Sequence, residues 1–132
     1  GRRDGDPRRA ESGRSAMIGP DLSRVAVYVR PGATDMRKAI NGLSIIVAEQ
    51  MAGDPLCGAL YVFCNRERRI LKALWWDRNG FWLVQKRLER DRFPWPASEQ
   101  AAREITADEL RMLLDGIDFW HAHRTRVYES VS

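Results

Sequence analysis

Runs of apolar and β-branched residues, separated by polar turns, predict four strands along the chain. The segment VAVYV at 25–29 stops at Pro31-Gly32, as a strand followed by a turn does. Two further strands are expected at 59–64 (ALYVFC) and 70–77 (ILKALWWD), joined by the polar turn NRERR, and FWLVQKRLER follows as the last one. Because short turns join neighbouring strands, the last three are expected to form an antiparallel meander.

The turn between the last two strands, residues 77–80, reads Asp-Arg-Asn-Gly and contains the Asn-Gly pair that is typical of tight hairpins. Such turns need positive φ, so Asn79 and Gly80 are expected to adopt it. On this prediction, Gly80→Val would lower the free energy of unfolding by about 1 kcal/mol or more.

A helix is predicted from Thr34 to about 51, where apolar residues recur at helical spacing: Met36, Ile40, Leu43 and Val47. Thr34 and Asp35 would cap its N-terminus. Arg37 and Lys38 would then lie in the first turn, where the partial positive charge of the helix end disfavours cations unless an anion faces them. We expect an internal ion pair, with Asp35 or another acidic group, for one cation and an external anion such as phosphate for the other.

A second helix is predicted from Thr106, because Thr106 and Glu109 have the spacing of a capping box. Its apolar face would be formed by Leu110, Leu113 and Leu114. Gly116 is placed to end it. The order of strand, helix, three strands and helix predicts an α+β fold, with two helices packed on an antiparallel sheet of three to four strands.

The length of 132 residues suits one domain with a real core and is too short for two. Residues 1–16 contain no Val, Ile, Leu or aromatic residue and are expected to form a disordered leader. If Met17 is the natural start of the folded protein, the leader is either an upstream extension or an artificial addition. We expect a single domain over 17–120 and a C-terminal tail over 121–132.

The composition is typical of a cytoplasmic globular protein. No apolar run approaches the roughly 18 residues that span a bilayer, so no membrane partner is expected. The two cysteines, Cys57 and Cys64, make no disulfide framework and fit a compartment with reduced thiols. The net charge is +4, and the leader accounts for half of it, with five arginines against three acidic residues. Any electrostatic site on the folded part must therefore be a local patch.

Cations surround the first hairpin turn and follow the last strand, with aromatic residues between them. If the strands are neighbours, six cations are candidates for binding nucleic-acid phosphates: Arg37, Lys38, Arg68, Arg69, Lys86 and Arg87. Exposed tryptophans would offer flat surfaces to bases or to a partner protein, and the candidates are Trp76, Trp82 and Trp95. The alternative is a solvated charged face over core aromatics, because several tryptophans must be buried.

The search for catalytic chemistry finds no candidate site. A metal-dependent nuclease needs several converging carboxylates, and the acidic residues here are scattered over caps, turns and helix surfaces. His121 and His123 with the two cysteines lack the close Cys-x-x-Cys spacing of zinc sites. No phosphate-binding glycine loop or nucleophile elbow occurs. The sequence therefore predicts a protein that is not an enzyme and that holds no metal or cofactor.

Three blocks, PGATDMRKAINGL, GALYVFCNRERRILKALWWDRNGFWLVQKRLERDRFPWP and ITADELRMLLDGID, resemble a known family in order and spacing. The family is the short accessory protein of IS66-type insertion sequences, encoded by the second open reading frame and of TnpB type. The RNA-guided nucleases also called TnpB are unrelated. The resemblance runs from about Tyr28 to about Asp118 and fades after Trp120. It implies a role in transposition, with element DNA, the transposase and other proteins of the same element as partners.

Two function classes remain open at this point. The first is an accessory factor that binds element DNA through the six cations named above. The second is a protein-interaction module that binds the transposase or another accessory protein through exposed tryptophans and the segment LRMLLDGIDFW, without contacting DNA. Ionic strength distinguishes them, because phosphate contacts weaken steeply with salt and apolar docking does not. The oligomeric state stays open.

Overall fold

The computed structural model describes residues 24–97 and 104–120. Within them lie five strands and two helices. The strands are β1 (Val27–Val29), β2 (Leu60–Cys64), β3 (Ile70–Asp77), β4 (Gly80–Arg87) and β5 (Glu104–Ile105), and the helices are α2 (Ile40–Gln50) and α3 (Ala107–Leu114). The leader and tail expected at 1–16 and 121–132 fall outside the described residues.

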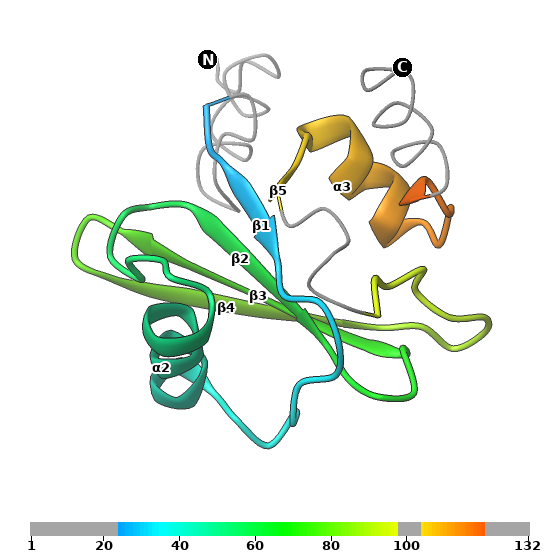
Figure 1. Ribbon diagram of the computed structural model, residues 1–132, viewed down its shortest axis with the longest axis horizontal. Helices are drawn as coiled ribbons and strands as arrows, with labels where there is room; N and C mark the ends of the chain where they lie inside the picture. Colours follow the sequence, from blue (N-terminus) through cyan, green and yellow to red (C-terminus); the bar gives the residue numbers. More distant parts are fainter. Residues whose placement is uncertain (1–23, 98–103, 121–132) are drawn as a thin grey trace, which may run out of the picture.

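The five strands form one mixed sheet in the order β4-β3-β2-β1-β5 (Figure 1). The predicted antiparallel meander is confirmed, since β2 pairs with β3 and β3 with β4, with Trp75 opposite Trp82. The predicted antiparallel sheet of three to four strands is thus correct for most of its pairings, but the sheet has five strands, and one of its pairings is parallel. β1 runs parallel to β2, because the crossover through α2 returns the chain in the same direction, and β5 adds a short antiparallel edge to β1.

The fold is α+β with two helices packed on the sheet, as predicted, and the helices cover opposite faces of it (Figure 1). Side chains along β2 alternate between two buried clusters: Leu60, Val62 and Cys64 join the cluster with α3, whereas Tyr61 and Phe63 join the cluster with α2. Because both faces are covered there, every residue of β2 is buried. β2 is therefore the centre of the core, and the other strands and their turns are positioned by their pairing on either side of it.

The helix predicted from Thr34 begins six residues later, at Ile40. Its N-cap is Ala39, which makes no side-chain cap hydrogen bond. Thr34 is buried, and its hydroxyl accepts a hydrogen bond from Arg30 at 2.8 Å instead of capping a helix. Arg37 and Lys38 therefore lie in a loop before the helix, so the unfavourable first-turn charge expected for them does not arise.

The hairpin between β3 and β4 turns at Arg78-Asn79, one residue earlier than predicted. Arg78 has φ of +54°, whereas neither Asn79 nor Gly80 has positive φ. Gly80 is the first residue of β4, and a Cβ there would meet no atom within 4 Å. The predicted positive φ of Asn79 and Gly80 is therefore wrong, and the stability loss predicted for Gly80→Val loses its basis, because a β-branched side chain suits this position.

The helix α3 follows its local signals closely. Thr106 Oγ1 accepts from the Glu109 N–H, and the Glu109 carboxylate accepts from the Thr106 N–H, so the predicted capping box is confirmed. At the other end Gly116 adopts φ of +79°, and its N–H and that of Ile117 donate to Leu113 and Met112. This is a Schellman ending, and it turns the chain back toward the sheet.

Candidate functional site

The turn between β2 and β3 is an arginine-rich loop with a fixed backbone at one end of the sheet. The side-chain Oδ1 of Asn65 accepts from the N–H groups of Arg69 at 2.9 Å and Ile70 at 3.0 Å. The N–H of Arg68 donates to the Asn65 carbonyl at 3.1 Å, and Arg68 has φ of +63°. Local hydrogen bonds therefore hold the loop that carries three exposed arginines: Arg66, Arg68 and Arg69.

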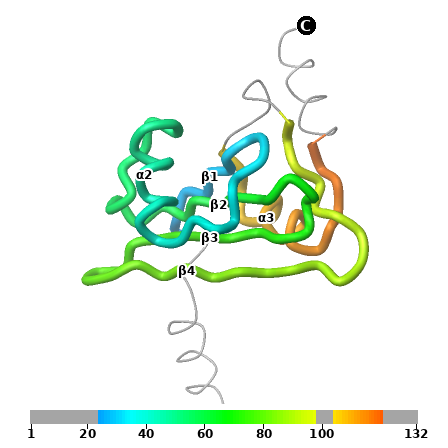
Figure 2. The backbone as a smooth tube through the Cα atoms, turned by 90° about the horizontal axis from the view of Figure 1, so that it is seen from below, coloured from blue at the N-terminus to red at the C-terminus, as the bar shows by residue number. Residues whose placement is uncertain are grey.

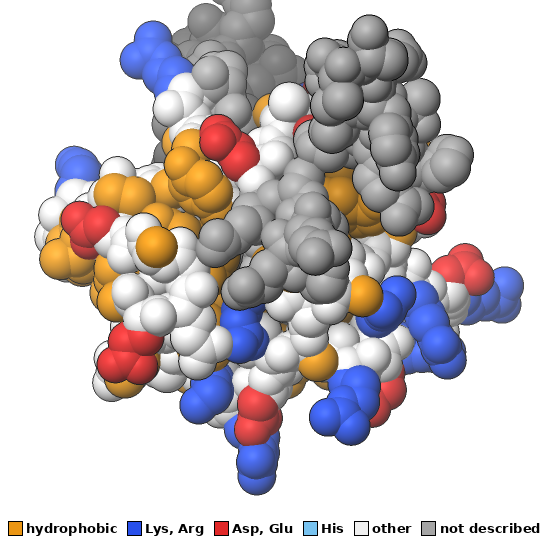
Figure 3. Space-filling model, in the orientation of Figure 1, with side chains coloured by type: hydrophobic (Ala, Val, Ile, Leu, Met, Phe, Trp, Pro, Cys, Tyr) orange, Lys and Arg blue, Asp and Glu red, His pale blue; other side chains and the backbone are white. Residues whose placement is uncertain are grey.

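The segment after β4 lies against this turn. The N–H of Leu88 donates to the Arg69 carbonyl at 2.8 Å, and that of Phe93 donates to the Arg68 carbonyl at 2.7 Å. Phe93 is fully buried, so it anchors the segment. Figure 3 shows Lys and Arg side chains gathered at the lower right, where β3 begins and β4 ends. We call this surface the basic end, and its members are Arg66, Arg68, Arg69, Arg87, Arg90 and Arg92.

Charge is only partly neutralised within the basic end. Arg87 Nε contacts Glu89 Oε2 at 3.0 Å, and Arg69 Nη1 lies 3.5 Å from the Glu89 carbonyl. The other four arginines, Arg66, Arg68, Arg90 and Arg92, make no side-chain hydrogen bond or ion pair to another described residue. Residues 66–69 and 87–92 together contain six arginines and three acidic residues, so this surface carries a local excess of three positive charges.

Lys86, a predicted phosphate-binding residue, does not join the basic end. Successive residues of a strand point to opposite faces, and Lys86 lies on the face of α3 whereas Arg87 lies on that of α2. Its Nζ donates to the Leu114 carbonyl at 2.7 Å, at the C-terminal end of α3. A cation there complements the partial negative charge of the helix end, so Lys86 has a structural partner.

The loop with Arg37 and Lys38 lies beside the basic end, because the Thr34 N–H donates to the carbonyl of Cys64, the last residue of β2. Arg37 donates two hydrogen bonds to the Asp35 carboxylate, from Nε to Oδ1 at 3.1 Å and from Nη2 to Oδ2 at 2.8 Å. This contact lowers the pKa of the Asp35 carboxyl to about 2. The expected internal ion pair is thus confirmed for Arg37.

Lys38 is exposed, and its side chain makes no hydrogen bond or ion pair to another described residue. Its alkyl chain lies over Gly42, where a Cβ would come within 3.1 Å of the Lys38 Cβ. Gly42 therefore leaves room for the Lys38 side chain beside the helix. An external anion for Lys38 stays a prediction.

A buried cation of β3, which is not one of the six phosphate-binding candidates, supports the same loop. Lys72, on β3, is only 8% exposed, and its Nζ donates to the carbonyls of Met36 and Lys38 at 2.8 Å each. An ammonium group accepts no hydrogen bond, so paired carbonyls are its suitable neighbours here. Lys72 stands 34 residues or more from them in sequence, which is why no local pattern reveals the contact.

The predicted tryptophans lie away from the basic end. Trp76 is half-buried and packs edge-on to Phe81, and Trp82 is 46% exposed, stacked on Trp75 with ring centroids 6.0 Å apart. Five residues separate Trp82 from Arg87, or about 16 Å along the strand. The structure therefore separates the aromatic surface from the cations, and the interleaved arrangement considered in the sequence does not form.

Trp95 is a core residue. It is 5% exposed, and its Nε1 donates to the Arg30 carbonyl at 2.8 Å. That bond satisfies the polar group of the indole and ties the segment after β4 to the end of β1. The predicted role of Trp95 in binding a partner is therefore not supported by its position.

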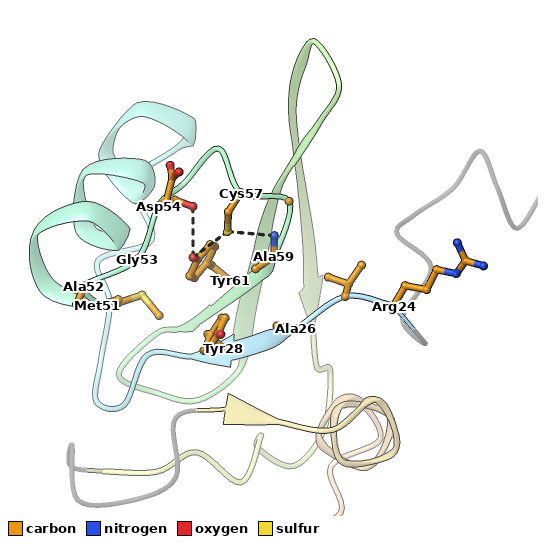
Figure 4. Close-up of a pocket in the computed structure, with 12 residues that line it drawn as sticks. Arg24, Ala26, Tyr28, Met51, Ala52, Gly53, Asp54, Cys57, Ala59 and Tyr61 are labelled. Atoms are coloured by element: carbon orange, nitrogen blue, oxygen red, sulfur yellow. Dashed lines mark hydrogen bonds between the residues drawn. The ribbon is translucent and has the colours of Figure 1, made fainter.

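A pocket of about 610 Å³ opens between the end of α2 and the starts of β1 and β2 (Figure 4). Tyr28 and Tyr61 stack in it with ring centroids 5.6 Å apart, and the Tyr61 hydroxyl lies 3.4 Å from both Cys57 Sγ and the Asp54 carbonyl. Burial raises the pKa of Tyr61 far above its usual value, so the hydroxyl stays neutral. Arg24 lines one end of the pocket, and its side chain extends outward (Figure 4).

Among the described residues, no three His, Cys, Asp or Glu side chains are grouped so as to hold a metal ion. The helices of this part of the chain are too short and too polar to cross a membrane. The features with evident chemical character are therefore the basic end, the aromatic strand β4 and the tyrosine pocket.

Comparison with known proteins places the chain in a family. Residues 25–124 match the family described as IS66 Orf2 like protein. The uncharacterized protein y4hO of Sinorhizobium fredii is 41% identical over 106 residues, which cover 80% of this chain and 92% of the relative. The uncharacterized protein y4jC of the same organism is 32% identical over 112 residues, covering 84% and 94%. No solved structure matches. The chain belongs to the IS66 Orf2-like family of insertion-sequence proteins.

Proposed function

We propose that this chain serves insertion-sequence transposition as a non-catalytic accessory protein that holds the phosphate backbone of element DNA at the basic end. Membership of the IS66 Orf2-like family implies the accessory role. The observation that supports DNA binding is the group of four arginines without a described side-chain partner around a hydrogen-bonded turn.

The geometry suits contacts to phosphate more than reading of bases. The guanidinium groups stand on short loops and at a strand end, and neither described helix belongs to the basic end, so none is placed there to enter a groove of DNA. Arginine offers paired N–H donors to phosphate oxygens, and such contacts position a protein on DNA without selecting a sequence. Lys38 extends the positive surface and is free to take an anion, whereas Asp35 neutralises Arg37.

The test compares two variants that remove the same charge. Arg66→Gln with Arg90→Gln removes two members of the basic end, and Arg78→Gln with Arg111→Gln removes two exposed arginines from the β3–β4 turn and from α3. Affinity for labelled duplex DNA is measured over a range of salt. Each lost phosphate contact reduces the slope of log affinity against log salt by about 0.9, so the first variant should lose up to about 1.8.

The control variant should keep the wild-type slope, because its arginines lie elsewhere on the molecule. An equal loss in both variants would mean that net charge, and not the basic end, attracts DNA. A wild-type protein without affinity for duplex or single-stranded DNA at about 50 mM salt would overturn the proposal, since even weak non-specific binders register there.

In that event the second function class takes its place. Trp82 and the exposed Ile117 after α3 would then dock on the transposase or another protein of the element. Capture of purified transposase by the wild-type chain, unchanged between low and high salt, would support this class, since apolar contacts do not weaken as phosphate contacts do.

A further inference from the structure

The outer edge of β4 is a long strand edge without a described partner. β4 ends the strand order, and no other described strand pairs with its outer side (Figure 2). Its pairing with β3 runs unbroken through eight residues, with no bulge and no proline. Natural sheets commonly protect such edges by bulges, prolines, very short strands or charged side chains, and β4 has only the last of these, Lys86 and Arg87 at its C-terminal end.

The hairpin fixes which backbone groups of β4 point outward. Asp77 and Gly80 close a two-residue turn and therefore form a hydrogen-bonded pair, after which bonded and non-bonded pairs alternate. On this alternation Gly80, Trp82, Val84 and Lys86 bond inward to β3. The outward N–H and C=O groups then belong to four other residues: Phe81, Leu83, Gln85 and Arg87.

We propose that β4 pairs antiparallel with β4 of a second copy of this chain, about a two-fold axis at Leu83. Leu83 then forms two hydrogen bonds with Leu83 of the second copy, and Phe81 pairs with Gln85 on either side. All these residues have outward N–H and C=O groups, so in this register the outward backbone groups of both strands find hydrogen-bond partners. The two sheets join into one continuous sheet, as in recognition by strand addition. The inference is independent of the proposed DNA binding.

The exposed apolar side chains of β4 are symmetric about Leu83. Trp82 is 46% and Val84 43% exposed, and both lie on the α3 face of the sheet. In the proposed register Trp82 of one copy lies opposite Val84 of the other, twice. These are non-bonded pairs, whose Cα atoms approach to about 4.5 Å, so the side chains come into close contact. An aromatic and a β-branched residue form a favourable cross-strand pair.

Charge selects the same arrangement. Lys86 lies opposite Gly80 of the second copy, so no side chain of the second copy lies directly opposite this cation. Parallel pairing would instead set Lys86 against Lys86 and Arg87 against Arg87, which like-charge repulsion disfavours.

The first test measures the mass of the full chain by light scattering as a function of concentration. The expected result is a concentration-dependent approach to twice 15.2 kDa. Gln85→Pro removes an outward N–H from an exposed edge position and should abolish the dimer while leaving the fold intact, because edge strands tolerate proline there. Circular dichroism checks the fold of the variant.

A matched pair of variants tests the side chains. Val84→Lys places a cation against Trp82 of the second copy and should shift the chain to monomer. Ile45→Lys makes the same change at a 54% exposed position on α2 and should leave the dimer unchanged. A chain that stays monomeric at every concentration overturns the proposal, as does a dimer that survives both Gln85→Pro and Val84→Lys.

Crosslinking tests the register. In a Cys57→Ser background, which removes the exposed native thiol, Leu83→Cys should give a disulfide-linked dimer under mild oxidation. Bonded pairs have Cα atoms about 5.5 Å apart, which suits a disulfide. Val84→Cys should crosslink far less, since the two copies of residue 84 are offset by two positions. Preferential crosslinking through residue 84 overturns the Leu83 axis.

Discussion

Replacing Lys72 by methionine tests whether the buried ammonium holds the loop before α2. Methionine keeps an unbranched apolar stem of similar length, so packing changes little. It leaves the carbonyls of Met36 and Lys38 without the donor that contacts each at 2.8 Å. A partly buried acceptor that loses its partner costs about 1 kcal/mol or more, so the two together cost about 2 kcal/mol or more.

The opposing effect is that methionine has no charge to desolvate. An ammonium at 8% exposure is costly to bury, and its removal returns part of the loss. The two effects oppose each other. We therefore expect the free energy of unfolding to fall by about 2 kcal/mol, the minimum cost of the two lost contacts, and not by more. For a domain of this size that corresponds to a fall of about 8 to 16 °C in the melting temperature.

Urea unfolding followed by tryptophan fluorescence provides the assay, with the midpoint falling and the slope unchanged. Lys38→Met is the control, because Lys38 is exposed and should change stability by less than about 0.5 kcal/mol. Equal stability of Lys72→Met and the wild type would refute the reasoning, since it would mean that relief of desolvation fully offsets the two lost contacts.

Three further predictions concern local contacts. Thr106→Ala should lower stability by about 1 kcal/mol in thermal unfolding, because it removes the capping box, and a smaller change than about 0.3 kcal/mol would contradict this. Gly53→Ala should cost about 1 to 3 kcal/mol, since its Cβ would lie 2.6 Å from the Tyr61 hydroxyl, and the loss should shrink in a Tyr61→Phe background. The Asp35 carboxyl should titrate by NMR near 2 and move toward 3.8 in Arg37→Gln. Because folding depresses this pKa, the stabilisation from the pair is present above pH 3.8 and is lost as the pH falls toward 2.

The sequence predicts an element well where its signals come from neighbouring residues. The ends of α3 are correct because Thr106, Glu109 and Gly116 form their contacts within a few residues of themselves. The meander is correct because short turns restrict how consecutive strands pair. β5 is missed because its two residues have no pattern of their own and are held by pairing with β1, far away in sequence.

The start of α2 shows how distant contacts override a local signal. Thr34 and Asp35 resemble helix caps, yet Arg30 takes the Thr34 hydroxyl and Lys72 draws the following carbonyls toward β3. A loop results where propensity favours a helix. The interaction with Lys72 crosses more than thirty residues, so no window of sequence contains it.

The candidate site is predicted in part for the same reason. Arg68, Arg69 and Arg87 meet because the meander brings the β2–β3 turn beside the end of β4. Strand alternation places Lys86 and Arg87 on opposite faces of the sheet, and the sequence alone predicts this. The contact of Lys86 with the end of α3 cannot be predicted, because it depends on how that helix packs on the sheet. Trp82 lies at the turn end of β4 and Arg87 at the opposite end, so the position of the turn alone predicts that Trp82 is distant from the cations.

The buried ammonium also orients the peptide groups above it. In a trans peptide the C=O and the next N–H point in opposite directions. Since the carbonyls of Met36 and Lys38 point inward to Lys72, the N–H of Arg37 and that of the residue after Lys38 point outward. The first of them is occupied by Asp35 Oδ1 at 2.9 Å. Two peptide dipoles thus stand in parallel with their positive ends to solvent, so a cation sealed beneath the loop makes the outer side of that loop electropositive.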